Sequence, residues 1–575
     1  MKQLKIFVLA ALLSALPLAV TAQEDESTND TTGSIEIGAM WTDVDGSPDK
    51  AAEFRTTEAG PVGKVKLSTF QDWGSLDFGV KYLATDENRG YLNFDIGRTV
   101  RSHNSYNKFP HRLGHDPMVY LESTSTNGKA VVKDDLNPNQ DYGVNYSVFQ
   151  DRTEFQFAGL KALTLAVEYR DQKRSGHTQA FTTSHCDSCH ITSTSHQRDQ
   201  STTDATLEAL VGFKNMSFRG RFTSRELNEK YNTVDATFDK NLHPELQLPV
   251  FDNRMQYDSD VGVVPADLKP DIDKDIARLD FRWASDNGLA ITANGVWAET
   301  TNQSSGNTAD YSGYVANVTK RFKNRLRLRW QGKIYQTDTK SVYIEPIQRV
   351  TPAGPQAGTT YYDVYQELFN QDRNSALNRD GLGSKLDASF RLGRHGTLRG
   401  MWNYSYVDRE YYEVLPGEKK TTTNLLGVSY RVRPMKGLRL DASLKYADVN
   451  NAFMLIDGAC STLVSEPWPN PWNPETPQYQ DFQGERIAET TASASSWMKA
   501  ELGAAWLTGK TTISGKYVYW DGDNSDGDLT DWSKNRTSFT VTAWTPGSAD
   551  WDWYVGYAYQ DMSLDVPLCI PVFDG

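Results

Sequence analysis

Cysteine is scarce in this chain, which has only Cys186, Cys189, Cys460 and Cys569 among 575 residues. This excludes the disulfide-dense scaffolds of small secreted proteins, although Cys460 and Cys569 could pair in an oxidising compartment. Positive charge is also scarce. The chain has 60 lysines and arginines but 74 acidic residues, so its net charge is −14. A nucleic-acid-binding surface needs clustered lysine and arginine. We therefore expect no nucleic-acid partner.

Long apolar runs are absent after residue 22. A membrane-spanning helix needs roughly 18 or more consecutive apolar residues, so such helices are excluded. The start of the chain differs, because Lys2 and Lys5 precede an apolar run over 6–20 and small residues lead up to Ala22. This pattern predicts a signal peptide over 1–22 and export of the mature chain.

Signatures of common enzymes are absent too. The sequence contains no G-x-S-x-G nucleophile elbow, no P-loop and no G-x-G-x-x-G dinucleotide fingerprint. We therefore do not expect an enzyme, and any enzyme interpretation depends on the haem motif described below.

Alternating apolar and polar residues fill most of the chain after 23–33, an acidic segment that we expect to be a flexible leader. In 438–446, for example, apolar residues at even positions alternate with polar residues at odd positions. Roughly twenty segments of about ten residues share the pattern, and many end in aromatic residues. The sequence predicts an all-β fold over 34–575, a large transmembrane antiparallel β-barrel of the bacterial outer membrane with long extracellular loops.

Charge on the polar faces supports this barrel. Arg325, Arg327, Arg329 and Lys333 alternate with apolar residues, as expected for a strand with one face on lipid and one on a water-filled lumen. An array of soluble β-sandwiches is the alternative, because alternation alone does not distinguish a lipid from a protein core. No linker separates the hairpins into groups that would form separate domains, and this favours the barrel.

The end of the chain does not fit a finished barrel. The strand that ends near Tyr559 runs, by parity, toward the outer side, and a loop-like tail with Pro567 and Pro571 follows it. Single-chain bacterial barrels have an even number of strands. We expect the chain to be incomplete at its C-terminus or to close irregularly.

One stretch predicts a specific chemistry. Residues 186–190 read Cys-Asp-Ser-Cys-His, which is the C-x-x-C-H attachment signature of a c-type haem. The thiols of Cys186 and Cys189 would bind one haem c covalently, and His190 would be an axial ligand of its iron. A disulfide between the two cysteines is a second interpretation, and zinc held by these residues with His196 is a third. The motif falls in a predicted outer loop at about 172–203.

A second axial ligand would come from a histidine near the motif. His196 is the nearest candidate downstream, and His177 lies upstream. A further group, His103, His111 and His115, could also supply a ligand. We expect that group to be a polar loop without metal, because no cysteine or carboxylate completes a ligand set at regular spacing.

The chain resembles the MtrB/PioB family of outer-membrane barrels in several features taken together. They are the signal peptide, the amphipathic strands, the segment RTEFQFAGLKALTLAVEYRDQKRSG and the CDSCH motif that follows it. These barrels are the porin components of porin–cytochrome conduits. The resemblance implies about 26 strands in a complete barrel, which sheathes a periplasmic multihaem c-type cytochrome that docks to an outer-surface multihaem cytochrome.

A physical argument supports such a partner. The membrane is about 40–45 Å thick with its headgroups, and one haem cannot relay electrons over that distance. A barrel of more than about twenty strands is wide enough for a protein plug. We expect a porin-like sheath for electron transfer across the outer membrane. The alternatives are a general diffusion or nutrient porin without a redox role and a surface haem enzyme.

Overall fold

The structure is a computed structural model that describes most of the chain. The described residues are 30–43, 53, 56, 59–83, 87–119, 123–124, 130–185, 189–237, 241–242, 249–251, 263–266, 269–323, 325–340, 342–344, 371–373, 378–393, 395–409, 420–450, 494–524, 532–547 and 551–565. No helix among them is long and apolar enough to cross a membrane.

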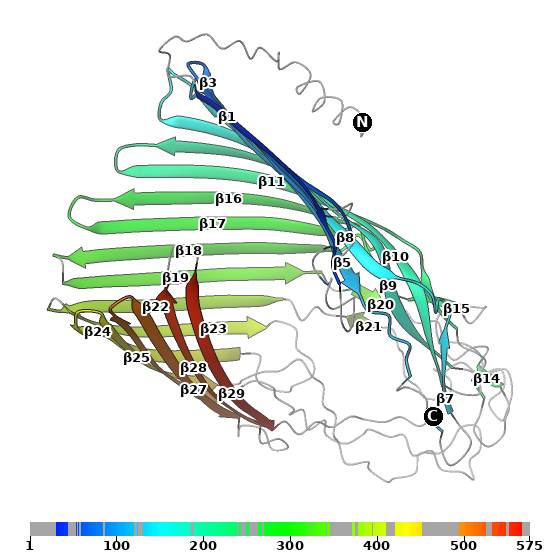
Figure 1. Cartoon of the computed structure of the whole chain (residues 1–575). Coiled ribbons are helices and arrows are strands. Elements are labelled where there is room, and N and C mark those ends of the chain that lie inside the picture. The colour runs from blue at the N-terminus through cyan, green and yellow to red at the C-terminus, as the bar shows by residue number, and fades with distance from the viewer. Residues whose placement is uncertain are drawn as a thin grey trace.

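One large sheet of 23 strands dominates the fold (Figure 1). Its first long strands are β1 Asp30–Met40, β2 Gly60–Gln71, β3 Gly74–Leu83, β4 Glu87–Ile96, β5 Val100–Leu113, β8 Tyr142–Gln156, β9 Leu163–His185, β10 Cys189–Gly212, β11 Met216–Tyr231, β16 Ile272–Ala284 and β17 Leu289–Asn302. It continues through β18 Thr308–Phe322, β19 Leu326–Thr339, β22 Arg379–Leu392, β23 Gly396–Arg409, β24 Lys420–Met435, β25 Leu438–Asn450, β26 Ser496–Thr508, β27 Thr511–Asn524, β28 Trp532–Pro546 and β29 Asp552–Asp565.

Short strands lie in the connections. Strands β6 Ser123–Thr124 and β7 Ala130–Asp135 belong to the large sheet, where β7 runs parallel to β10. Three two-stranded sheets pair β12 Val234–Thr237 with β15 Val263–Ala266, β13 Asn241–Leu242 with β14 Pro249–Phe251, and β20 Val342–Ile344 with β21 Gln371–Arg373.

Each long strand pairs antiparallel with the next long strand along the chain. Tight turns join the strands at one end of the sheet, which we call the turn end. At the other end, the loop end, most connections are longer, although those between β3 and β4 and between β9 and β10 are short (Figure 1). Among the described strands, β1 pairs only with β2 and β29 only with β28, and both run from the turn end to the loop end. The prediction of an all-β antiparallel barrel with roughly twenty strands is confirmed.

The outer face of the sheet is apolar over the middle of the strands. Rows of large side chains are exposed along successive strands, such as Leu382, Leu386 and Phe390 on β22, each more than 40% exposed. They alternate with polar residues on the other face, because successive side chains in a strand point to opposite sides. A surface this apolar is stable only against lipid. The chain is therefore an outer-membrane β-barrel, as the sequence predicts.

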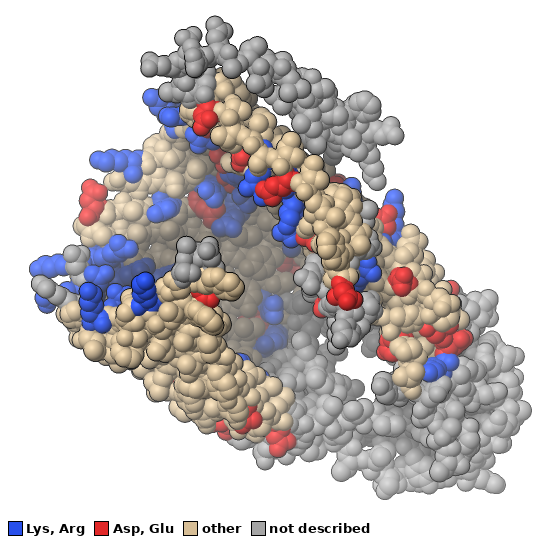
Figure 2. All heavy atoms as spheres, viewed as in Figure 1, with Lys and Arg blue, Asp and Glu red and all other residues tan. Residues whose placement is uncertain are grey.

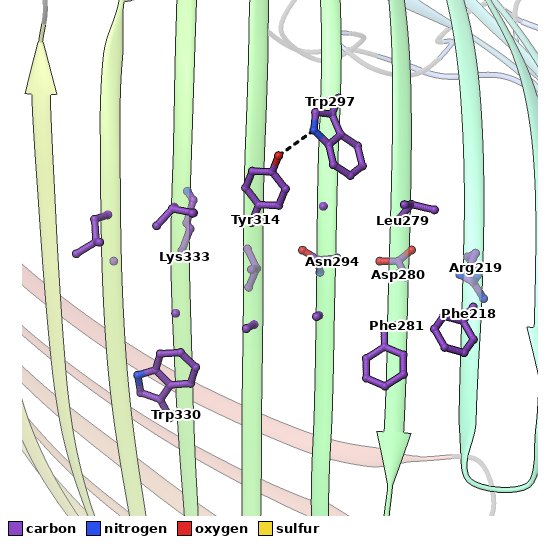
Figure 3. A pocket seen from close by; sticks show the side chains of 18 of the residues that line it. Phe218, Arg219, Leu279, Asp280, Phe281, Asn294, Trp297, Tyr314, Trp330 and Lys333 are labelled. Carbon is purple, nitrogen blue, oxygen red and sulfur yellow. Dashed lines mark hydrogen bonds between the residues drawn. The ribbon is translucent and has the colours of Figure 1, made fainter.

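Glycines on this outer face make room for aromatic rings. Trp297 lies over Gly295 and Trp330 over Gly332, where an added Cβ would come within 2.8 and 2.7 Å of the rings. The nitrogen Nε1 of Trp297 donates a hydrogen bond of 3.0 Å to the hydroxyl of Tyr314 on the next strand (Figure 3). These residues border an apolar depression of about 660 Å³ that faces lipid.

Two boundaries differ from those expected. Strand β1 begins at Asp30, inside the segment 23–33 that the sequence suggested was a flexible leader. The segment 172–203, expected to be an outer loop, is instead strand on both sides of a tight reversal. The signal peptide over 1–22 lies outside the described residues.

Candidate functional site

The haem-attachment motif lies at the end of an unusually long hairpin. Strands β9 and β10 have 23 and 24 residues and pair from Leu163 opposite Val211 at the turn end to His185 opposite Cys189 at the loop end. At about 3.3 Å per residue each strand is roughly 75–80 Å long. A membrane-spanning strand needs only about 9–11 residues. The loop-end half of the hairpin, about 40 Å, therefore stands beyond the lipid belt, where Figure 1 shows it beside β7.

Polar residues on both faces build this extension. Its sequence is rich in threonine and serine, and β-branched threonine favours extended backbone. Ser193 is fully buried and accepts a 2.7 Å hydrogen bond from Nε2 of Gln179 on β9. Asn137, in the turn after β7, accepts a 2.7 Å hydrogen bond from the backbone nitrogen of Ser195. These bonds tie β7, β9 and β10 into one extramembrane sheet.

A tyrosine at the loop end of β8 is packed under this extension. Tyr142 is only 4% exposed, and its ring contacts the ring of His115 edge-on at 5.1 Å. Burial, together with the nearby charge of Asp135, raises the pKa of the Tyr142 phenol above its usual value. Tyr142 therefore stays neutral and helps to close the interior of the extension.

Two glycines allow β8 and β9 to approach closely where the extension begins. Gly176 on β9 has a φ of 154°, and an added Cβ would lie 2.0 Å from the carbonyl oxygen of Gly143 on β8. No residue with a side chain fits at this φ without strain. Glycine at position 176 thus allows both the backbone conformation and the short distance to Gly143 that this point of the sheet requires.

The described part of the motif continues strand β10. Cys189 pairs with His185 on β9 and with Val131 on β7, so the strand starts at the second cysteine. Cys186 lies in 186–188, outside the described residues. The donor set fits a c-type haem in residue type and order, with two thiols two positions apart and a histidine directly after the second. Cys186 and Cys189 would hold the group, and His190 would ligate its iron.

In the register of β9 and β10, the two histidines expected as the second axial ligand, His196 and His177, both lie far from His190. His196 lies six residues further along β10 than His190, about 20 Å at 3.3 Å per residue. Its ring is 1% exposed and packs edge-on against Tyr231 at 5.6 Å. His177 on β9 pairs with Gln197, bonds to Ser195 at 3.1 Å, and points to the opposite face from His196.

The other histidine group is dispersed. His103 and His111 do not lie in a loop as expected but on strand β5, eight residues apart, and Nδ1 of His103 lies 3.3 Å from Oδ1 of Asn93. His115 bonds to Asp135 at 2.6 Å. No group of three or more metal-binding side chains occurs within the described part of the chain. Cys460 and Cys569 fall outside that part.

The luminal face of β8–β11 holds a network of ion pairs at the level of the membrane. Arg152 donates to Glu154 at 2.8 Å, to Glu168, and across β9 to Glu208 at 2.9 Å. Arg221 donates to the same Glu208 at 2.7 Å and to Glu168 at 3.2 Å. The side chain of Glu208 is 2% exposed, so its buried charge depends on the arginines beside it.

A second group continues the network toward the loop end. Asp204 accepts two hydrogen bonds from Arg225, at 2.6 and 2.9 Å, and lies 3.5 Å from Arg170. Charge on this wall of the lumen is thus largely compensated. No pattern in the sequence marks these residues, because their pairing depends on the register of four strands.

The luminal face of β22–β27 has an excess of positive charge. A pocket of about 940 Å³ opens there. Its basic lining residues are Lys385, Arg399, Arg431, Arg439, Lys445 and Lys516, and its acidic ones are Asp441 and Glu501. Figure 2 shows lysine and arginine gathered at the turn ends of the strands, on the left of the view. The alternation around Arg327 and Lys333, noted in the sequence, belongs to the same wall.

The two carboxylates of this pocket are each shared by basic side chains. Asp441 lies 2.5 Å from Arg431 and 2.9 Å from Arg439. Glu501 pairs with Lys499 at 2.9 Å and with Lys516 at 3.4 Å.

Comparison with solved structures gives a likeness to receptors and transporters of low sequence identity. The fold is similar to that of the siderophore receptor PiuA from Acinetobacter baumannii, at 9% identity and a TM-score of 0.44, over 95% of this chain and 81% of that one. It is similar to the ferric citrate transporter FecA, at 9% identity and a TM-score of 0.40, over 90% and 70% of the two chains. The copper transporter OprC gives 11% identity and a TM-score of 0.40, over 87% and 71%. No family model and no curated protein matches the sequence.

Proposed function

We propose that this protein is an outer-membrane sheath for electron transfer, related to the MtrB/PioB barrels that its sequence resembles. Its lumen would hold a periplasmic multihaem c-type cytochrome, and its loop end would meet an outer-surface multihaem cytochrome. One c-type haem, attached at Cys186 and Cys189 with His190 as axial ligand, would lie at the tip of the β9–β10 hairpin. When bound, such a haem supplies a one-electron redox centre.

The position of the motif carries this proposal. A plain diffusion pore needs no C-x-x-C-H sequence and no strand beyond the membrane. Here about 40 Å of paired strand, at 3.3 Å per residue, holds Cys189 and His190 outside the lipid belt. Long connections of outer-membrane barrels face the exterior. The motif would therefore lie where an outer-surface partner can reach it.

The lumen supports the same function. Charged side chains line it on both walls, with compensated pairs on β8–β11 and an excess of basic residues on β22–β27. Such walls suit a hydrophilic occupant rather than lipid. Because one haem cannot cross a membrane about 40–45 Å thick, the occupant must supply the remaining redox centres.

Haem staining after denaturing electrophoresis tests the covalent attachment. The full chain is produced in a bacterium with a c-type cytochrome maturation system, beside Cys186→Ala/Cys189→Ala and, as a matched control, Cys460→Ala/Cys569→Ala. We expect haem on the wild type and on the control but not on the first variant. A wild-type chain without haem would leave the disulfide or zinc interpretation of the motif.

Co-purification tests the conduit. The wild-type barrel, extracted from the native outer membrane, should carry a second haem-containing polypeptide, and proteoliposomes of the complex should reduce an enclosed acceptor from outside. A barrel that purifies alone and passes small solutes would be a diffusion porin. Peroxidase activity that is lost in His190→Ala, with transmembrane electron transfer intact, would indicate a surface haem enzyme.

A further inference from the structure

Basic side chains form a continuous strip on the luminal face from β19 to β27, which we call the basic wall. It consists of Arg327, Arg329, Lys333, Lys385, Arg399, Arg431, Arg439, Lys445, Lys499 and Lys516. Strands β19, β22, β23, β24, β25, β26 and β27 are consecutive neighbours in the sheet. At about 4.8 Å per strand the strip is roughly 29 Å wide.

Lipid headgroups cannot be the partner of this strip. Residues on one strand alternate between faces, and the neighbours of the basic residues, such as Leu386, Leu444 and Leu502, form the exposed apolar rows of the outer face. The basic wall therefore faces the lumen, as the pocket of about 940 Å³ on that face also requires.

Some basic residues of the wall lie directly beside other basic residues on the neighbouring strand. Lys445 lies directly opposite Lys499 in the register of β25 and β26, and Arg327 lies opposite Arg321 on β18. Like charges directly opposite one another destabilise a strand pair. Lys385 and Lys445 form no ion pair or hydrogen bond with any residue that the structure describes. An anionic occupant would offset this repulsion.

The floor between the basic residues is partly open. Gly503, Ser429 and Ser443 line it without large side chains, whereas Met401 packs over Gly427, where an added Cβ would lie 2.7 Å from the Met401 Cγ. Lysine and arginine around such a floor can donate to carboxylates. On the opposite wall, Glu208 and Asp204 pair with Arg152, Arg221 and Arg225. Residues of the basic wall also form ion pairs, but among the described residues of that wall its ten members share only three carboxylates, those of Asp387, Asp441 and Glu501.

We propose that the basic wall docks the acidic face of a protein held in the lumen. A phosphate-sized anion would need one cluster of basic groups, whereas a strip about 29 Å wide matches a protein interface of about 800 Å² per partner. The inference rests on the proposed function, since it gives the surface chemistry of the periplasmic cytochrome: carboxylates, including any exposed haem propionates, facing β22–β27.

Binding of fluorescein-labelled poly-L-glutamate to the full chain in detergent tests the wall. We expect the affinity of Lys385→Glu/Lys445→Glu for this probe to be lower than that of the wild type by roughly tenfold or more. Both lysines without an ion pair are replaced by glutamates, which repel the anionic probe. Binding by the wild type should also weaken as salt rises, because exposed charges are screened. Fluorescence anisotropy at low and high ionic strength measures both effects.

The matched control is Lys161→Glu/Lys214→Glu, two turn lysines on the opposite wall with the same change in net charge. It should alter probe binding less than about twofold. If the glutamates disturb the barrel, the neutral variant Lys385→Gln/Lys445→Gln replaces them in the test. The folding of each variant is checked by its heat-modifiable migration on a gel. Equal binding of poly-L-lysine, or no loss in the lysine variants, would overturn the proposal. Full displacement of poly-L-glutamate by millimolar inorganic phosphate would indicate a small-anion pore instead.

The two proposals fail separately. If a haem partner co-purifies equally with wild type and Lys385→Glu/Lys445→Glu, the basic wall is not its docking surface and the conduit stands. If the probe binds as expected but no haem protein accompanies the barrel, the conduit fails and an acidic protein of another kind occupies the lumen.

Discussion

Arg152 on β8 donates a 2.9 Å hydrogen bond to Glu208 on β10, so this pair reaches across the whole width of β9. Arg221 on β11 approaches the same carboxylate from the other side at 2.7 Å. Four strands are thereby joined by side chains as well as by backbone hydrogen bonds. This wall anchors the base of the hairpin that carries the haem motif.

Replacing Glu208 with alanine should destabilise the barrel by about 1–3 kcal/mol. The change leaves Arg152 and Arg221 without their shared buried carboxylate, and breaking a fully buried pair costs about 3–5 kcal/mol; these arginines are partly exposed, which lowers the effect. Urea unfolding in detergent, followed by tryptophan fluorescence, measures the loss. Glu226→Ala, an exposed glutamate on β11, is the control and should change stability little. An unchanged midpoint for Glu208→Ala would contradict the network's role.

Gly176→Ala should distort the junction between barrel and extension. The new Cβ would lie 2.0 Å from the carbonyl oxygen of Gly143, and backbone strain of this kind costs about 1–3 kcal/mol. Limited proteolysis should then cut within 172–203, while Gly159→Ala, whose Cβ meets open space, should leave the digestion pattern unchanged. Identical digests of all three proteins would argue against a constrained junction.

Glu299→Gln should stabilise the barrel. On the outer face, Asp275, Glu299, Asp310 and Asp338 lie directly opposite one another across β16–β19, in the order β16, β17, β18 and β19. Removing one charge relieves repulsion worth about 0.2–1 kcal/mol per pair. Thermal unfolding in detergent at low salt should show a raised midpoint, and the difference should shrink as ionic strength rises. A lowered midpoint at low salt would mean that the row is not repulsive.

Histidine variants separate the two axial positions of an attached haem. His190→Ala should change the visible absorption spectrum, because the motif loses its iron ligand. His196→Ala should leave the spectrum unchanged but lower the unfolding temperature, since the ring is buried against Tyr231. A change of spin state in His196→Ala or His177→Ala would show that the end of the hairpin departs from the described register.

The barrel strands were predictable because one face of each must meet lipid. A strand that meets lipid on one face needs an apolar residue at every second position, as along 438–446. Once such segments are recognised, the tight turns between them can be located too. The extension of β9 and β10 was missed for the same reason. Both of its faces are polar, so Thr192, Thr194 and Ser195 carry no alternation of polarity. Their β-branched and hydroxyl-rich composition was the available signal.

The candidate site was predictable only in part. The order of Cys186, Cys189 and His190 is a local pattern and can be recognised in one sequence. The partners of Glu208 and the two carboxylates opposite Glu299 depend on strand register, and a shift of one residue would turn each to the other face. Pairings of this kind require the assembled sheet.

The β9–β10 extension is a sheet rather than a loop, and this affects the time course of any encounter at its tip. A flexible loop of similar length would sample many positions, and each collision would find the tip in a different place. Paired strands that β8 and β11 flank at the base and β7 flanks near the tip move together rather than as separate segments. A partner arriving from outside would meet the tip at a nearly fixed height, so the spread of donor–acceptor separations among collisions would be narrow.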